Sequence, residues 1–252
     1  MSRAFPIAIF VCLALAFAGA LSGQAPPPTG TSMGNEKAPT GPTPRTPEGK
    51  VDFSGVWDPG SAFFNIGQVP LQPWAAELYA QRRANLGKDD PEAQCLPAGV
   101  PRISPFPQKF VQTPTLIVIL DEGNVHSYRQ LFLDGRGHPK NMDPLWMGDS
   151  IAKWDGDTLV VDTTGFNDKT WLTGQGVPHS EELHVIERYR RPDFGHLDVE
   201  ITLEDPKAFT KPTPSSVGSF CCRTGRFTST SATSSMSIKI ISWGSKESKR
   251  TK

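Results

Sequence analysis

The sequence predicts a mainly β protein, an antiparallel barrel or sandwich with one helix ahead of its main strands. Successive segments alternate apolar and polar residues and are joined by turn sequences, which is typical of β-hairpins. Only one long segment, at about residues 73–86, has the spacing of an amphipathic helix. The 252 residues suffice for a sizeable core, but 24 Pro and 23 Gly beside 37% hydrophobic residues indicate that part of the chain does not pack.

The first 21 residues have the pattern of a secretory signal peptide. Arg3 gives a basic start, residues 4–17 are almost wholly apolar, and residues 18–20 form a small-residue cleavage sequence. We therefore expect a secreted or periplasmic protein without a stable membrane anchor. A retained anchor is the alternative, which Pro6 and the shortness of the apolar run disfavour. Residues 22–50 hold seven Pro among Gly, Ser and Thr, and we expect a disordered linker.

The predicted β domain spans residues 51–210 and begins its regular structure with the helix. Pro73 suits a first helical turn, Trp74 and Leu78 fall four residues apart on one face, and Gly87 ends the pattern. Three hairpins are then expected, each with a turn sequence between two period-two segments. They cover residues 115–133 around a turn at 121–124, residues 149–166 around Gly156-Asp157, and residues 182–203 around a turn at 192–195.

The last of these segments shows the alternation most clearly. Leu197, Val199, Ile201 and Leu203 fall on one face, and the residues between them are polar. This pattern predicts an antiparallel sheet with one apolar face. Near the start of the domain, Gly55-Val56-Trp57 resembles the Gly-x-Trp entry of the first lipocalin strand, where the Trp closes one end of the barrel. Together with the hairpins, this resemblance favours a lipocalin-like barrel.

The net charge of zero is an average over three different segments. Residues 1–50 carry +2, residues 51–210 carry −9 and residues 211–252 carry +7. The predicted β domain is therefore acidic, which argues against a strongly basic nucleic-acid binder.

Residues 211–252 are rich in Ser and Thr, and we expect a disordered basic tail. A reading-frame slip after about residue 212 is the alternative, because the neighbouring frame reads as two strands around a Pro-Asp-Gly turn. The slip also bears on Cys95. This residue has Cys221 or Cys222 as a partner, or it has lost its natural partner with the original frame.

Several motifs of the domain resemble a family of secreted bacterial proteins that is abundant in soil bacteria. The resemblance covers about residues 50–210 and brings no established activity. The family carries a Cys-Asn-Glu segment near its end, which this chain lacks in frame, in agreement with the slip. The motifs are Asp-Gly-Arg-Gly-His-Pro at 134–139, Trp-Met-Gly-Asp-Ser at 146–150, Trp-Asp-Gly-Asp-Thr-Leu-Val-Val-Asp-Thr-Thr-Gly-Phe-Asn at 154–167 and Pro-His-Ser-Glu-Glu-Leu-His at 178–184.

The leading functional hypothesis is a small-molecule ligand in the barrel mouth, with acid–base chemistry as an extension. Polar groups that converge among aromatic side chains are how such sites are usually built. No cofactor and no metal are needed for this chemistry. The candidate acid–base residues are His138, Asp149, His179, Glu182 and His184, and the candidate ligand-binding residues are Trp146, Trp154, Phe166, Trp171 and Arg188. The simplest placement of Arg188, Arg190 and Arg191 is a solvated face.

Three alternatives remain open. Gly148-Asp149-Ser150, with later Gly-Phe-Asn-Asp and Asp-Phe-Gly-His blocks at 165–168 and 193–196, resembles the SGNH hydrolases, in which the Ser would be the nucleophile. That Ser needs a strand-to-helix turn on a parallel sheet, whereas Ser150 is predicted to lie in a hairpin. A metal held by His179, His184 and Glu182, with His138 approaching from another loop, is the second alternative. A purely structural envelope protein is the third.

Overall fold

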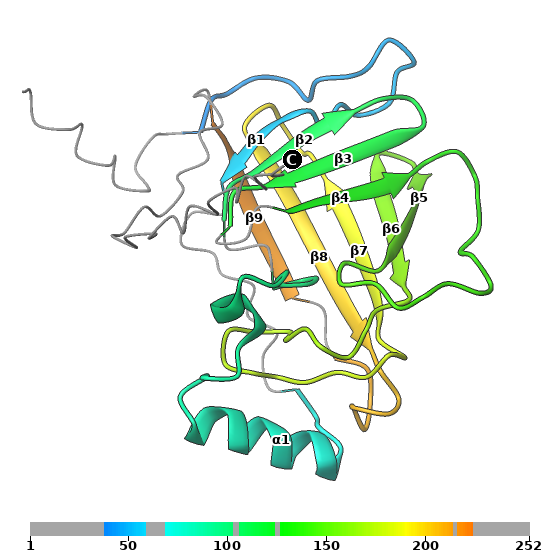
Figure 1. Ribbon diagram of the computed structural model, residues 1–252. Coiled ribbons are helices and arrows are strands. Elements are labelled where there is room, and N and C mark those ends of the chain that lie inside the picture. The colour runs from blue at the N-terminus through cyan, green and yellow to red at the C-terminus, as the bar shows by residue number, and fades with distance from the viewer. Residues whose placement is uncertain (1–37, 59–68, 103–105, 124–126, 214–215, 224–252) are drawn as a thin grey trace, which may run out of the picture. The chain divides into compact units, whose positions relative to one another are not determined.

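The computed structural model describes residues 38–58, 69–102, 106–123, 127–213 and 216–223, and for residues 216–223 the backbone alone. Nine strands in the described residues form a closed barrel in which each strand pairs with the next and β9 pairs with β1 (Figure 1). The prediction of a mainly β, lipocalin-like barrel with one α-helix is confirmed. The elements are β1 (Gly55–Asp58), α1 (Pro73–Ala84), the short 3-10 helix η1 (Pro91–Gln94), β2 (Gln108–Gln112), β3 (Leu116–Asp121), β4 (Ser127–Phe132), β5 (Asp149–Asp155), β6 (Thr158–Thr164), β7 (His184–Arg190), β8 (His196–Glu204) and β9 (Ser216–Arg223).

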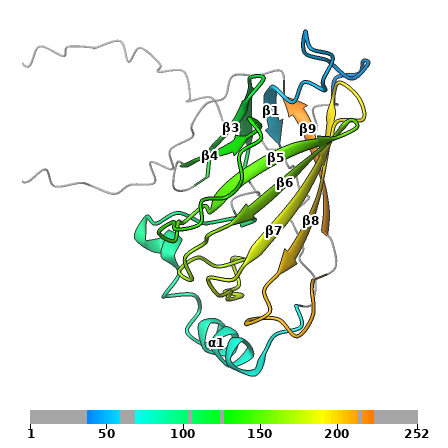
Figure 2. The same ribbon diagram turned by 90° about the vertical axis from the view of Figure 1, so that its right-hand side faces the viewer.

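The seam between β4 and β5 differs from every other seam of the barrel. These two strands run parallel, whereas the other neighbouring pairs are antiparallel. A parallel pair needs a long connection, here residues 133–148. Only Leu131 with Ser150 and Phe132 with Ile151 are in register across the seam, so most of each strand diverges from the other (Figure 2).

The barrel interior is filled by alternate residues of the strands. In β8 the predicted apolar face, Leu197, Val199, Ile201 and Leu203, is at most 1% exposed, and the residues between them are half-buried or exposed. Removal of these side chains from water is the main driving force for closing the sheet around them.

Trp57 of β1 is fully buried and donates its indole N–H to the Phe53 carbonyl at 2.9 Å. The guanidinium of Arg191 lies 4.7 Å above the Trp57 ring and donates to backbone carbonyls, among them that of Phe194 at 2.7 Å. The expected solvated position of Arg191 is therefore wrong. The aromatic face and the carbonyls compensate for removing this cation from water.

Helix α1 begins at Pro73 as predicted and ends two residues earlier than expected. Ala75 is its one buried residue, so the helix is held mainly by long side chains. Arg82 stacks 4.8 Å from the Trp171 ring and donates to the Gly176 carbonyl at 3.1 Å. Among the residues that the structure describes, no helix is long and apolar enough to cross a membrane.

Two expected boundaries of the β domain need correction. Residues 38–50, assigned to a disordered linker, contact the barrel: Arg45 forms a 2.7 Å ion pair with Asp157, and Thr43 donates to the Arg191 carbonyl at 3.1 Å. At the other end, β9 lies inside the expected tail, because edge strands β1 and β8 both offer it backbone hydrogen bonds.

The other predictions about the ends of the chain concern residues outside the described ones. The predicted signal peptide, residues 22–37 and residues 224–252 lie outside the described residues. Cys95 is exposed with a free thiol, and the side chains of Cys221 and Cys222 are outside the description. The reading-frame slip stays a prediction.

Candidate functional site

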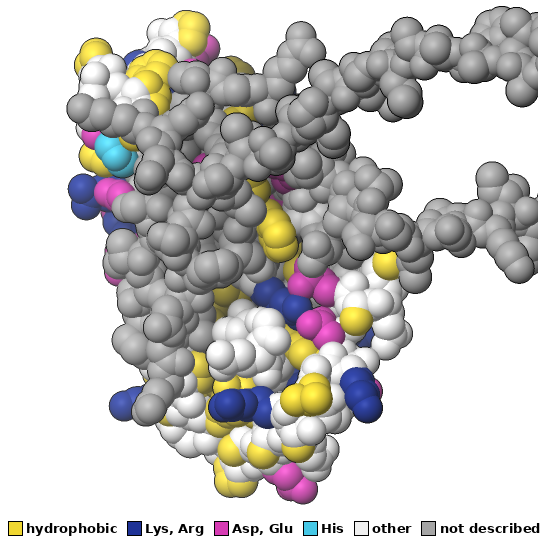
Figure 3. Space-filling view, turned by 90° about the vertical axis from the view of Figure 1, so that its left-hand side faces the viewer, with side chains coloured by type: hydrophobic (Ala, Val, Ile, Leu, Met, Phe, Trp, Pro, Cys, Tyr) yellow, Lys and Arg dark blue, Asp and Glu magenta, His cyan; other side chains and the backbone are white. Residues whose placement is uncertain are grey.

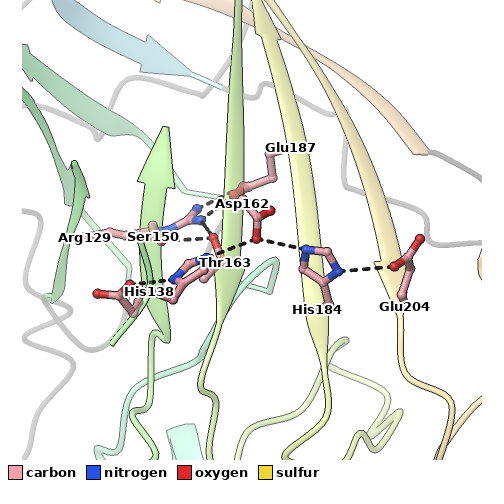
Figure 4. A network of polar contacts seen from close by, with 9 residues as sticks. Arg129, His138, Ser150, Asp162, Thr163, His184, Glu187 and Glu204 are labelled. Atoms are coloured by element: carbon pink, nitrogen blue, oxygen red, sulfur yellow. Dashed lines mark hydrogen bonds and ion pairs between the residues drawn. The ribbon is translucent and has the colours of Figure 1, made fainter. Parts of the chain in front are cut away.

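The barrel interior contains a buried ion pair that the sequence did not single out. Arg129 of β4 is 5% exposed and Glu187 of β7 is 2% exposed. The guanidinium donates two hydrogen bonds to the carboxylate, one from Nη1 to Oε1 at 2.9 Å and a second from Nη2 to Oε2 (Figure 4). Burial by itself lowers the pKa of Arg129, but the charge and hydrogen bonds of Glu187 outweigh it and leave the pKa raised. Arg129 is therefore a fixed cation inside the barrel.

Hydroxyl groups from β5, β6 and β7 complete this interior network. Arg129 donates from Nε to the Ser150 Oγ at 3.0 Å and from Nη2 to the Thr163 Oγ1 at 2.6 Å. The Tyr189 hydroxyl donates to Glu187 at 2.9 Å. Strand alternation is the signal that could have located the network, since Arg129 shares a face with Leu131, and Glu187 lies between the inward residues Val185 and Tyr189.

The predicted nucleophile, Ser150, is 1% exposed and lies in this network, with Arg129 and Thr163 as its hydrogen-bond partners. The histidine expected to serve it in a hydrolase, His196, instead contacts Asp193 at 2.9 Å in the turn between β7 and β8. The first two blocks of the hydrolase motif are neighbours, since Gly148 lies against Phe166, but the Asp193-His196 block lies at the opposite end of β8 from the residue aligned with Ser150.

A second polar chain runs across the outer surface of β5 to β8. His138 lies between Asp149 (Nδ1 to Oδ1, 2.7 Å) and Asp162 (Nε2 to Oδ1, 3.2 Å). His184 lies between the same Asp162 oxygen (2.9 Å from Nε2) and Glu204 (3.2 Å from Nδ1) (Figure 4). The structure thus brings His138, Asp149 and His184 together as expected, but outside the barrel and with two carboxylates that the sequence did not single out.

His179 and Glu182 do not join this outer chain. His179 is 2% exposed; its Nδ1–H donates to the Ser180 carbonyl at 2.9 Å, and its Nε2 accepts from the Thr170 hydroxyl at 2.7 Å. Burial lowers the pKa of His179, so the neutral ring is favoured. Glu182 is exposed and pairs with Lys207 at 2.8 Å. Both residues lie in the connection between β6 and β7 rather than on a strand.

The predicted ligand-binding residues are scattered. Phe166 is core and meets the His179 ring edge-to-face at 6.2 Å, and Trp171 is buried beside Arg82. Arg188 is half-exposed and pairs with Asp155 at 2.8 Å. Trp154 stacks on Phe53 at 5.7 Å and lines a cavity of about 560 Å³ together with residues 45–50. Of these five residues, Trp146 alone lines a second cavity, which Arg129 and Ser150 of the interior network also line.

That cavity, also about 560 Å³, lies where β4 and β5 diverge. Arg129 and Ser150 link it to the interior network, and Asp149 links it to the outer chain. The connection before β5 contributes an apolar wall. The full lining is Pro97, Ser127, Tyr128, Arg129, Gln130, Phe132, Leu145, Trp146, Met147, Gly148, Asp149 and Ser150.

The described surface seen in Figure 3 carries basic and acidic side chains next to one another, interspersed with hydrophobic ones. Within the described residues, no group of three or more His, Cys, Asp or Glu has an arrangement that could hold a metal ion. No family model, curated protein or solved structure matches this chain. The site must therefore be understood from its own geometry.

Proposed function

We propose that this is a secreted small-molecule-binding barrel whose ligand enters between β4 and β5. The observation that carries the proposal is the 560 Å³ cavity at this seam, with Trp146 on its wall and Arg129 and Ser150 at its contact with the barrel interior. Its volume is in the range of small-molecule sites, and such sites combine an apolar wall with a few fixed polar groups. The network holds Arg129 and Ser150 in place before any ligand arrives, which lowers the entropy cost of binding.

The partners of Ser150 favour binding over hydrolysis. A serine nucleophile needs a neighbouring base to take its proton. Ser150 has the guanidinium of Arg129, which is a donor only, and the hydroxyl of Thr163. In this setting Ser150 acts as a hydrogen-bonding group for a ligand.

Acid–base chemistry by His138 is the second candidate function, favoured by one contact. Asp149 lines the cavity and binds Nδ1 of His138 at 2.7 Å, which orients the ring as a carboxylate orients a catalytic imidazole. A ligand that reached the rim beside Asp149 would lie next to this pair.

The binding proposal is tested with Trp146→Ala on the full chain, with Trp74→Ala as the matched control. Trp74 is 44% exposed on α1 and does not line the cavity. We expect an uncharged fluorescent aromatic probe, 1-anilinonaphthalene, to bind at least about tenfold more weakly to Trp146→Ala, since an aromatic wall of the site is lost. Trp74→Ala should bind the probe as the unchanged protein does. Equal binding to all three proteins would remove the seam cavity as the site.

A His138→Gln variant separates the two candidate functions. It should leave probe affinity unchanged, because His138 does not line the cavity and the amide of the Gln can still donate a hydrogen bond to Asp149 in place of the ring. If an activity is found in a screen of small esters and glycosides, its loss in His138→Gln but not in Ser150→Ala would support acid–base chemistry at the outer chain.

A further inference from the structure

Two buried oxygens next to the seam cavity have no hydrogen-bond partner. Asp121, the last residue of β3, is 3% exposed; its Oδ1 accepts from Gln108 at 2.7 Å, and its Oδ2 has no partner. Ser127, the first residue of β4, has a buried Oγ that also lacks a partner. A buried polar atom left unpaired is costly, so such atoms in a folded protein point to a missing contact.

The strand register places these two side chains together. Asp121 and Ser127 are directly paired across β3 and β4, and directly paired side chains lie on the same face of a sheet. Ser127 lines the seam cavity together with Arg129. Asp121 does not itself line the cavity; its carboxylate lies next to Ser127, which does.

The charges of this part of the barrel do not cancel. Arg129 is matched by Glu187, with which it forms two hydrogen bonds. Asp121 has only the neutral amide of Gln108 as its hydrogen-bonding partner. Within this group of three charged residues, one negative charge remains uncompensated, and it attracts a cation.

We propose that Asp121 and Ser127 recognise the cationic, hydrogen-bond-donating head group of the ligand, an alkyl- or arylalkyl-ammonium. This inference rests on the proposed function and assigns the ligand class of the same cavity. An ammonium group has several N–H donors, enough for Asp121 Oδ2 and Ser127 Oγ at once, while the apolar part of the ligand packs on Trp146 and Met147.

The ionisation of Asp121 makes the proposal pH-dependent. Burial raises the pKa of Asp121 to about 7, against the opposing effects of the Gln108 hydrogen bond and the Arg129 charge, and with a further rise from Glu187. The carboxylate form binds a cation, so affinity should increase as the pH rises from 6 to 8.

The test is calorimetric titration of the full chain with benzylamine, with benzyl alcohol as its uncharged analogue. Benzylamine should bind at least about tenfold more tightly than benzyl alcohol at pH 8, as expected for hydrogen bonds to a charged group. This preference should shrink at pH 6. It should disappear in Asp121→Asn, whose amide oxygen can still accept from Gln108, and decrease in Ser127→Ala. Asp155→Asn, which removes an exposed carboxylate paired with Arg188, should leave it unchanged.

The outcomes separate the inference from the function on which it rests. Equal binding of the two probes, with both weakened by Trp146→Ala, would overturn the ammonium assignment and leave the binding cavity intact. A preference that survives in Asp121→Asn would also overturn it, provided that circular dichroism shows the variant folded. If neither benzyl probe nor the anilinonaphthalene probe binds, the proposed function fails, and the inference fails with it.

Discussion

At the scale of single residues, the buried charges of Arg129 and Glu187 are compensated by the side chains around them. Arg129 and Glu187 satisfy one another, and hydroxyls of Ser150, Thr163 and Tyr189 take up further hydrogen-bonding capacity. A buried ion pair of this kind adds little net stability, but removing one partner leaves the other as an uncompensated buried charge. For the proposed binding site, the ion pair fixes a cation and three hydroxyls in one geometry.

Asp121 has no such compensation, and its cost to the fold should therefore depend on pH. The carboxyl pKa is about 7 in the folded protein and near 3.8 in the unfolded chain. Between these values the folded state binds a proton that the unfolded state does not, so the contribution of Asp121 to stability is full below about pH 4 and is lost as the pH rises through 7. We predict that Asp121→Asn is more stable than the unchanged protein at pH 8, with the difference shrinking towards pH 5. Between about pH 4 and pH 7, the contribution of Asp121 to the free energy of unfolding should fall by on the order of 4 kcal/mol.

Urea unfolding at pH 5 and pH 8 measures this effect. Asp155→Asn serves as the control, because Asp155 is exposed and its loss should give the same small change at both pH values. A stability difference between Asp121→Asn and the unchanged protein that stays constant with pH would contradict the buried, proton-binding carboxyl.

At the scale of elements, the connection from β4 to β5 decides the shape of the candidate site. Near the start of this connection, His138 contacts Asp149 and Asp162. Near its end, Leu145 forms a β-bridge with Phe166. The connection then supplies Trp146 and Met147 to the cavity wall. The outer His-carboxylate chain thus fixes the β4–β5 connection, which lines the cavity.

Gly148 fixes the end of that segment. Its φ of 66° is in the left-handed region, and a Cβ there would lie 2.8 Å from Thr163 Cγ2 and 2.9 Å from the Thr164 carbonyl oxygen. We predict that Gly148→Ala lowers both stability and probe binding. Gly156→Ala is the matched control, because Gly156 has a similar φ of 61° but nothing within 4 Å of the added carbon.

The control variant should lose about 1–2 kcal/mol of stability, the cost of a left-handed alanine, and keep its probe affinity. Gly148→Ala should lose clearly more, since packing strain is added to the backbone cost. Denaturant unfolding and probe titration measure the two effects. Equal losses in both variants would show that the contacts with Thr163 and Thr164 do not matter.

At the scale of the whole molecule, the barrel depends on its last described strand. β9 pairs with both β8 and β1, so it joins the two ends of the sheet. Without it, β1 and β8 become unpaired edges beside a large apolar interior, which favours unfolding and edge-to-edge association. A strand from the basic, Ser- and Thr-rich end of the chain fills this place because closure depends on backbone groups, which every residue carries.

We predict that a chain ending at residue 213 aggregates or unfolds at a lower temperature than one ending at residue 223. The longer chain keeps every strand pair that the structure describes, so it is the direct control. Size-exclusion chromatography and thermal circular dichroism compare the two. A monomeric shorter chain with an unchanged melting temperature would show that β9 is not needed for closure.

The sequence by itself determined the features that depend on short stretches of chain. Helix α1 follows from Pro73 and a four-residue spacing, and the β5–β6 hairpin follows from Gly156-Asp157, which pairs Asp155 with Thr158 as a two-residue turn requires. The inward face of β8 follows from strict alternation. Each is a local property, because turn geometry and side-chain period are set within a few residues.

Only the tertiary structure decided which distant side chains meet. A four-residue turn at 192–195 would pair residue 191 with residue 196 and set His184 opposite Leu203, whereas the observed register sets it opposite Glu204. That shift of one residue puts the carboxylate of Glu204 beside the imidazole, because neighbouring residues of a strand face opposite ways. In the same way, the parallel seam between β4 and β5 brings Arg129 to Ser150 and opens the cavity that Ser127 lines. Contacts of this kind depend on barrel closure, and closure is a property of all nine strands together.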